Sequence, residues 1–142
     1  MAGILCAIRG GPASQSTIET SINLAKETGE TIYFLYVINL DFLTHSTSSR
    51  TDRIYEDMRA MGEFILIDAQ DRAHRLGAKA ETVIADGNVI KQIIAVASGK
   101  NARYVVLGTP SSENENNLFV RNKSQAVAER IRSETQAEVI FS

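Results

Sequence analysis

The sequence predicts an α/β protein in which short apolar strands alternate with amphipathic helices along one domain. Runs such as "GILCAI" and "TIYFLYVI" are apolar at successive positions, as expected of strands buried on both faces. The segments between such runs carry apolar residues every three or four positions, which is the period of a helix packed on a core. Because only crossover helices can connect and cover strands of this kind, the expected fold is a doubly wound parallel sheet with helices on both faces.

The first third of the chain is predicted to form a strand, a helix and a second strand. The first strand is expected over Ile4–Ile8, before the turn "RGGP". The helix that follows begins near Pro12 and ends before Gly29, because proline suits a first helical turn and glycine suits a helix end. The second strand is expected over Thr31–Ile38, where β-branched and aromatic residues are concentrated.

A long connection and a long helix come next. The segment 39–52, "NLDFLTHSTSSRTD", is rich in serine and threonine and has weak periodicity, so we expect an exposed, mobile loop. From Ile54 the apolar positions keep a spacing of three or four residues until Leu76, just before Gly77. This is the longest helix that the sequence predicts.

The second half is predicted to contain three strands and two helices. The third strand lies in "KAETVIADG", and either Asp86 or Asn88 caps the helix that follows, which Gly99 closes. The fourth strand is "RYVVLG", and the fifth is "AEVIFS" at the end of the sequence. Between them, Val127 and Ile131 mark the inner face of the last helix.

Composition and charge limit the classes of function that the chain could have. With 142 residues, 44% hydrophobic and 23% charged, we expect one globular domain over residues 1–142. A formal net charge of −2 argues against a nucleic-acid partner, since phosphate backbones need clustered excess base. No apolar run is long enough to span a membrane, so we expect no membrane insertion. The single Cys6 lies in an apolar run, which predicts a buried core thiol and fits a reducing cytoplasm.

Two loops are candidates for a ligand site. In open parallel sheets a ligand sits beyond the carboxyl ends of the strands, where the strand order reverses. The first loop is "RGGP", with Arg9 and Gly10, and the second is "GTPSS", which begins at Gly108 and includes Thr109 and Ser111.

The order of these segments resembles the universal stress protein family over essentially the whole chain. "YVVLGT" is similar to the family's "IVMGS", and "SQAVAERI", from Ser124 to Ile131, resembles the start of the family's last helix. The resemblance implies a five-stranded parallel sheet in the order 3-2-1-4-5 with four helices. It also implies a homodimer formed through the last strand, which is apolar and should not remain exposed.

The resemblance also implies where a nucleotide would bind, and this sequence departs from that pattern. The family's ATP-binding branch carries Gly, two residues, Gly, nine residues, then Gly and Ser or Thr. Here only Gly108 is kept, while Ser111, Arg121 and Asn122 occupy the other three positions. Because glycine lets the backbone approach a phosphate without a Cβ, the loop keeps the length of the motif and loses its chemistry. An aspartate that nucleotide binders tend to carry after the first strand is Arg9 in this chain.

Side chains offer a second way to hold an anion. Arg9 and Arg121 would face one crevice, with Lys123 near a helix start, so they could bind a phosphate in place of the lost amides. The competing interpretation is that both arginines are solvated or pair with Glu113 or Glu115. Those two carboxylates also disfavour a triphosphate close to the loop.

Other residues at the crevice have two interpretations each. By resemblance, Val37 and Leu107 lie where the family lines its adenine pocket, but ordinary packing at strand ends is the favoured interpretation. The hydroxyls of Thr109 and Ser111 could donate to a phosphate or to their own backbone. His45 and His74 have no metal-ligand spacing and are expected at the surface, and no motif specifies a catalytic residue.

The resemblance therefore implies a cytoplasmic, stress-linked regulatory or signalling protein that acts through protein partners. It would not bind ATP through a glycine loop, and no cofactor is expected. One alternative is a module that binds ATP, another adenine nucleotide or phosphate weakly through Arg9 and Arg121, with slow ATPase activity at most. Another alternative is a regulatory subunit of a transporter, because the chain resembles stress-type domains appended to such proteins.

Overall fold

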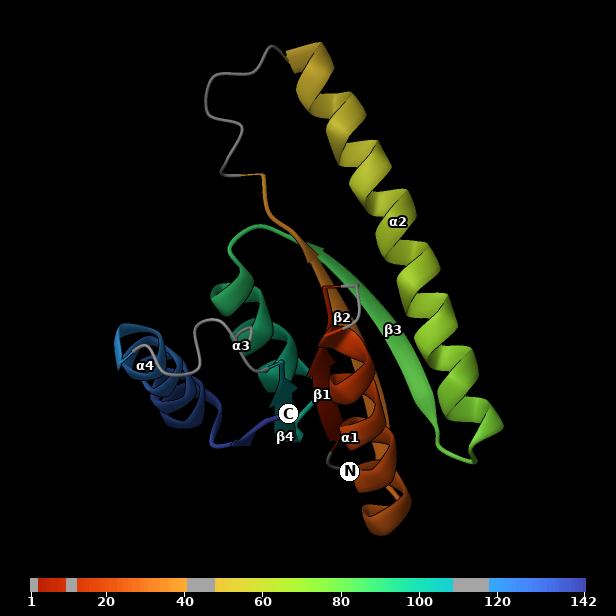
Figure 1. Ribbon diagram of the computed structural model, residues 1–142, viewed down its shortest axis with the longest axis vertical. Helices are drawn as coiled ribbons and strands as arrows, with labels where there is room; N and C mark the ends of the chain where they lie inside the picture. Colours follow the sequence, from red (N-terminus) through yellow and green to blue (C-terminus); the bar gives the residue numbers. More distant parts are fainter. Residues whose placement is uncertain (1–2, 10–12, 41–47, 109–117) are drawn as a thin grey trace.

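The computed structural model describes residues 3–9, 13–40, 48–108 and 118–142, which form five strands and four helices (Figure 1). In chain order the elements are β1 (Gly3–Ala7), α1 (Ala13–Thr28), β2 (Thr31–Ile38), α2 (Ser48–Arg75), β3 (Ala80–Asp86), α3 (Val89–Gly99), β4 (Ala102–Leu107), α4 (Leu118–Thr135) and β5 (Glu138–Phe141).

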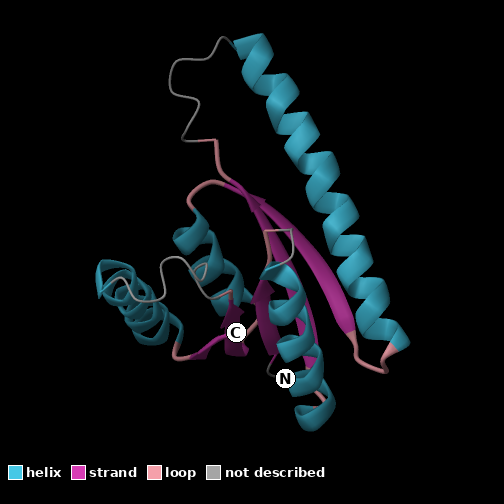
Figure 2. Cartoon of the chain, in the orientation of Figure 1, coloured by secondary structure: helices cyan, strands magenta, loops and turns pink. Residues whose placement is uncertain are grey.

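All five strands are parallel and lie in the order β3-β2-β1-β4-β5, which confirms the predicted sheet. The sheet separates two layers of helices, as Figure 2 shows. Helices α1 and α2 pack on one face, around Ile4, Cys6 and Phe34, and helices α3 and α4 pack on the other, around Leu5 and Leu35. Successive residues of one strand thus serve opposite cores, as the pleat of a strand requires.

The predicted helix ends are confirmed at three places. Gly29 and Gly77 follow α1 and α2 with φ of 76° and 88°, a left-handed conformation that glycine adopts without a steric penalty. Asn88, one of the two predicted caps, accepts a hydrogen bond from the Lys91 amide at 3.0 Å and begins α3. Asp86, the other, instead accepts from the Tyr55 hydroxyl of α2 at 3.0 and 2.9 Å.

Two helix starts and one helix end differ from the predictions. Helix α2 begins at Ser48, inside the segment expected to be a loop, because exposed polar residues extend its solvated first turns without an apolar stripe. Helix α4 begins at Leu118, so Arg121 and Asn122 lie in helical backbone rather than in a loop. At the end of α3, Gly99 is the last helical residue, but Asn101 supplies the left-handed backbone, with φ of 53°. Residues 41–47 of the predicted mobile loop lie outside the described residues.

A glycine inside α2 sets how closely that helix approaches the sheet. Gly62 is buried against the ring of Tyr36 in β2, and a Cβ at Gly62 would lie 2.5 Å from Tyr36 Cδ1. Tyr36 is itself buried, so its ring has little room to move. The close approach also lets Leu66, Ala69 and Ala73 of α2 pack into the core.

We predict that Gly62→Ala destabilises the fold by about 1–3 kcal/mol, because overpacking against Tyr36 outweighs the better helix propensity of alanine. Gly99→Ala is the matched control: Gly99 is also helical, and no atom lies within 4 Å of its added Cβ. That variant should gain up to about 1 kcal/mol. Urea denaturation of both variants measures the difference, and equal stabilities would contradict the close packing of α2.

Candidate ligand crevice

The sheet reverses its strand order at β1, which pairs with β2 on one side and with β4 on the other. The chain leaves β1 for α1 on one face, while the chain leaving β4 leads to α4 on the other face (Figure 1). The carboxyl ends of β1 and β4 therefore lie side by side at the place where sheets of this class hold ligands, which we call the crevice, with Arg9 beyond the first strand and Gly108 beyond the second.

Arg9 stands at the crevice with an exposed side chain. Its backbone amide donates to the Ser14 hydroxyl at 3.4 Å, which ties the end of β1 to the first turn of α1. Among the described residues, no carboxylate forms an ion pair with the Arg9 guanidinium. The competing partners Glu113 and Glu115 lie outside the described residues, so the exposed position of Arg9 is what the structure establishes.

Beside Gly108, at the other border of the crevice, lie two hydroxyl groups that were not predicted from the sequence, those of Thr17 and Ser142. Thr17 of α1 is 1% exposed, and a Cβ on Gly108 would lie 3.3 Å from its Oγ1. The Ser142 hydroxyl donates to Thr17 Oγ1 at 3.1 Å, and the Ser142 amide donates to the Leu107 carbonyl at 3.0 Å. A side chain at Gly108 would thus press on α1, so a glycine here has a packing role whether or not a ligand binds. In the described part of α1, Thr17 shares the buried face with Ser14 and Ser21, and small hydroxyl residues at helical spacing beside Ile18 and Ile22 were the sequence signal for this contact.

Val37 and Leu107 are half-buried at the ends of their strands. Both pack against the core on the α3 and α4 face, beside Leu35, Ile93 and Val105. Core packing therefore accounts for Val37 and Leu107, the two residues at positions similar to the family's adenine pocket.

The remaining predicted site residues are distributed as follows. Gly10, Thr109 and Ser111 lie outside the described residues, as do Glu113, Glu115 and His45. Arg121 and Asn122 lie in the first turns of α4. The structure thus brings Arg9 and Gly108 to one crevice, and it moves the start of the helix to a point before Arg121.

Cys6 and His74 take the places expected from the sequence. Cys6 is fully buried under α1, where its thiol donates to the Thr17 carbonyl at 3.8 Å, and burial raises its pKa to about 12. His74 is exposed on α2, with Nε2 3.3 Å from the Ala80 carbonyl. Across the described ranges, no three His, Cys, Asp or Glu side chains gather as a metal site would need. In those ranges, no helix has both the length and the apolar content to cross a membrane.

A parallel, doubly wound sheet with a crevice at its reversal of strand order defines a class of α/β proteins that place small ligands there. Within that class, the profile of the Universal stress protein family matches residues 2–134, and the chain belongs to this family. It is 26% identical over 136 residues to the universal stress protein YxiE of Bacillus subtilis, covering 89% of this chain and 90% of that relative.

Solved structures share the fold at lower sequence identity. The universal stress protein UspA of Lactobacillus plantarum is similar with a TM-score of 0.78 at 16% identity, covering 99% of this chain and 96% of that one. Two further relatives were solved as nucleotide complexes. A universal stress protein in complex with cAMP has a TM-score of 0.70 at 15% identity and covers 99% and 95% of the two chains. A universal stress protein from Archaeoglobus fulgidus in complex with dAMP has a TM-score of 0.63 at 16% identity and covers 99% and 97%.

We predict that Cys6 does not react with iodoacetamide at pH 8 in the native protein, because the thiol stays protonated well below a pKa of about 12. In urea the same thiol should react at the rate of a free cysteine. Since the unfolded thiol ionises at lower pH than the folded one, the contribution of Cys6 to stability should fall as the pH rises from about 9 toward 12. Mass spectrometry of the alkylated chain measures the rates, and fast labelling of the native protein would contradict the burial.

Proposed function

We propose that this chain is a stress-linked regulatory protein of the cytoplasm that acts through protein partners and does not bind ATP through a glycine loop. The observation that carries the proposal is the position of α4, which begins at Leu118. Only the first four amides at a helix N-terminus, that of the cap included, lack an intrahelical acceptor. The amides of Arg121 and Asn122, which stand where the glycine motif would wrap a phosphate, are therefore used within α4.

The contacts of Gly108 support the same proposal. In the family's ATP-binding branch the first glycine of the motif belongs to the phosphate loop, and here Gly108 is held against the Thr17 hydroxyl. Its retention has a packing reason that needs no nucleotide. With no catalytic motif in the sequence, regulation is also favoured over catalysis.

We predict that isothermal titration with ATP, ADP and AMP, each with and without magnesium, gives no heat of binding up to millimolar ligand. The reason is that none of the backbone amides at Arg121 and Asn122 is free to bind a phosphate. Binding of ATP in the micromolar range would overturn the proposal.

A second candidate function is weak binding of an adenine nucleotide or phosphate through Arg9 and Arg121. The exposed Arg9 side chain, without an ion pair in the described part of the chain, favours it, as do the relatives solved with cAMP and dAMP. In this case binding is sensitive to salt, and Arg9→Gln weakens it about tenfold by removing a charge-assisted contact. If a nucleotide binds and Arg121→Gly strengthens the binding, Arg121 is an obstruction and this candidate is wrong.

We also propose that the protein is a homodimer joined through β5. This strand is the last in the sheet beside β4, and Phe141 on it is 38% exposed. An open apolar edge of this kind invites pairing with a second edge.

We predict a dimeric mass by light scattering and a shift toward the monomer in Phe141→Asp, because a charge would be desolvated in the interface. Phe64→Asp is the matched control, since Phe64 is an exposed phenylalanine on α2, on the other side of the sheet. It should leave the dimeric mass unchanged. A monomer in the unmodified protein would contradict the dimer.

A further inference from the structure

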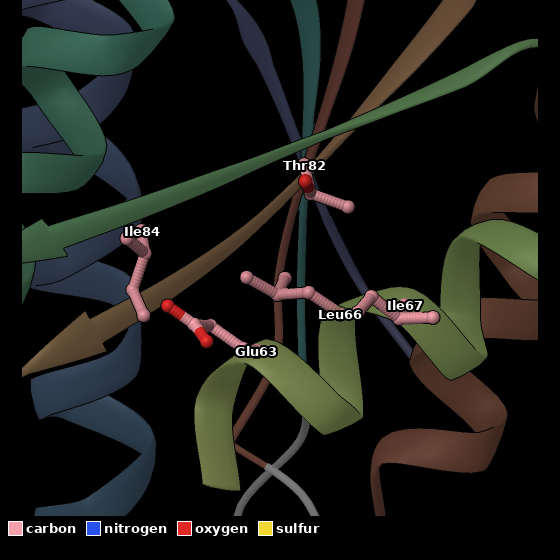
Figure 3. A pocket seen from close by; sticks show the side chains of 5 residues that line it. All are labelled: Glu63, Leu66, Ile67, Thr82 and Ile84. Carbon is pink, nitrogen blue, oxygen red and sulfur yellow. The ribbon is translucent and has the colours of Figure 1, made fainter. Parts of the chain in front are cut away.

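A groove lies at the opposite edge of the sheet, between α2 and β3. It contains a cavity of about 260 Å³ lined by Glu63, Leu66 and Ile67 of α2 and by Thr82 and Ile84 of β3. Figure 3 shows Glu63 and Leu66 projecting from α2 on the side of Ile84, with the Glu63 carboxylate directed toward Ile84. The groove and the crevice lie at different parts of the sheet, because β2 separates β3 from β1.

The β3 edge offers backbone groups at the same two residues. The Lys79 carbonyl accepts from Ile32 of β2, and the Gly87 amide donates to the Ile38 carbonyl, each at 2.9 Å. Because residues of a parallel strand bond alternately to its two sides, the amides and carbonyls of even-numbered residues in β3 face outward. Thr82 and Ile84 thus present open backbone groups beside the cavity that their side chains line.

The Ala80 carbonyl, the first on β3 that faces away from β2, confirms that even-numbered residues face outward. It already accepts a hydrogen bond from α2. Gln70 of α2 donates to the Ala80 carbonyl at 2.9 Å, and His74 Nε2 lies 3.3 Å from the same oxygen. The side chains of α2 therefore cover the start of the edge, as exposed edges commonly require. In the described part of the chain, the outward groups of Thr82 and Ile84 have no such cover.

One flank of α2 supplies an apolar contact beside this open edge. Phe64 and Ile67 are 73% and 62% exposed, which is unusual for large apolar side chains on one helix. A helix turns by about 100° per residue, so Met61 and Ile67 lie on opposite flanks of Phe64. Ile67 is on the flank that lines the cavity, and Met61 is on the flank turned away from it.

Two carboxylates lie along the groove, and one of them is paired with an arginine. The Glu63 carboxylate lines the cavity and is half exposed, and its ion pair with Arg59 at 3.2 Å is also open to solvent. Glu56, two turns earlier on the same flank, is exposed and forms no ion pair among the described residues. A cavity lined by three aliphatic side chains and a carboxylate fits a side chain with an apolar stem and a cationic end, which is arginine or lysine.

We propose that this groove binds an extended segment of another protein, which adds as a strand to the β3 edge at Thr82 and Ile84. The segment carries an arginine or lysine that enters the cavity beside Glu63, and an apolar residue two positions along that packs on Phe64 and Ile67. Alternate side chains of a strand point to one face, so both reach α2 while the backbone bonds to the edge. The inference rests on the proposed action through protein partners, and it does not depend on whether a nucleotide binds in the crevice.

The probe is a capped, fluorescent octapeptide in which arginine and leucine alternate with threonine, titrated into the full chain without nucleotide. We predict saturable binding by fluorescence anisotropy. The same peptide with glutamate in place of arginine should bind at least about tenfold more weakly, since it places like charges beside Glu63. Hydrogen exchange followed by NMR should show the amides of Thr82 and Ile84 becoming protected when the arginine peptide is added.

Variants of the protein separate the groove from the rest of α2. Glu63→Gln should weaken the arginine peptide about threefold to tenfold, and Ile67→Asp should weaken it at least about tenfold. Met61→Asp is the matched control, because Met61 is 58% exposed on the other flank, and its effect should stay within about twofold. All three side chains are exposed, so thermal unfolding of the variants should match that of the parent protein.

Four results would overturn the proposal: no binding of the arginine peptide, equal binding of the glutamate peptide, no protection at Thr82 and Ile84, or equal losses in Met61→Asp and Ile67→Asp. Protection of these amides in the free protein that rises with protein concentration would also overturn it, because a second copy of the chain would then occupy the edge. A failed peptide titration leaves the nucleotide titrations unchanged, so failure here is distinguishable from failure of the proposed role at the crevice.

Discussion

The structure depends on the burial of β1, a strand of five residues that is bonded on both sides and covered on both faces. Ile4, Leu5 and Cys6 are fully buried, and they alternate between the core under α1 and α2 and the core under α3 and α4. A strand placed in this way cannot shift by one residue without exchanging the two cores. The register of β2 and β4 on either side of it, and so the site where the strand order reverses, follows from that constraint.

Much of this arrangement could be predicted from the sequence. Apolar runs between helical periods gave the alternation of strands and helices, and Gly29, Gly77 and Asn88 marked helix ends by their backbone or capping chemistry. The strand order came from the resemblance to a family, because alternation by itself is compatible with several orders. Residues that act through neighbours distant in sequence were not predicted: nothing in the helical period of α2 shows that Gly62 meets Tyr36, or that Thr17 meets Gly108 and Ser142.

The starts of α2 and α4 show where prediction from apolar periodicity fails for a physical reason. A periodicity argument needs buried apolar residues, and the first turns of α2 are solvated, so the pattern begins at Ile54 although the helix begins at Ser48. At α4 the same limit has a functional consequence, since the motif was counted as a loop up to Asn122 while the backbone is helical from Leu118. The number of residues between two motif positions therefore does not define the conformation between them.

Hydrogen bonds join helix α2 to β3 at both ends of the groove between them. Near one end the Tyr55 hydroxyl bonds to both oxygens of Asp86, and Arg59 donates to Tyr55 at 3.4 Å; near the other, Gln70 and His74 reach the Ala80 carbonyl. Two elements joined at two separated points keep a fixed spacing, so the space between them persists in the free protein. A binding surface that is already ordered loses little conformational entropy when it is occupied. The entropic cost of association at this edge would therefore fall on the incoming segment, and segments already stiffened in an extended form would have the advantage.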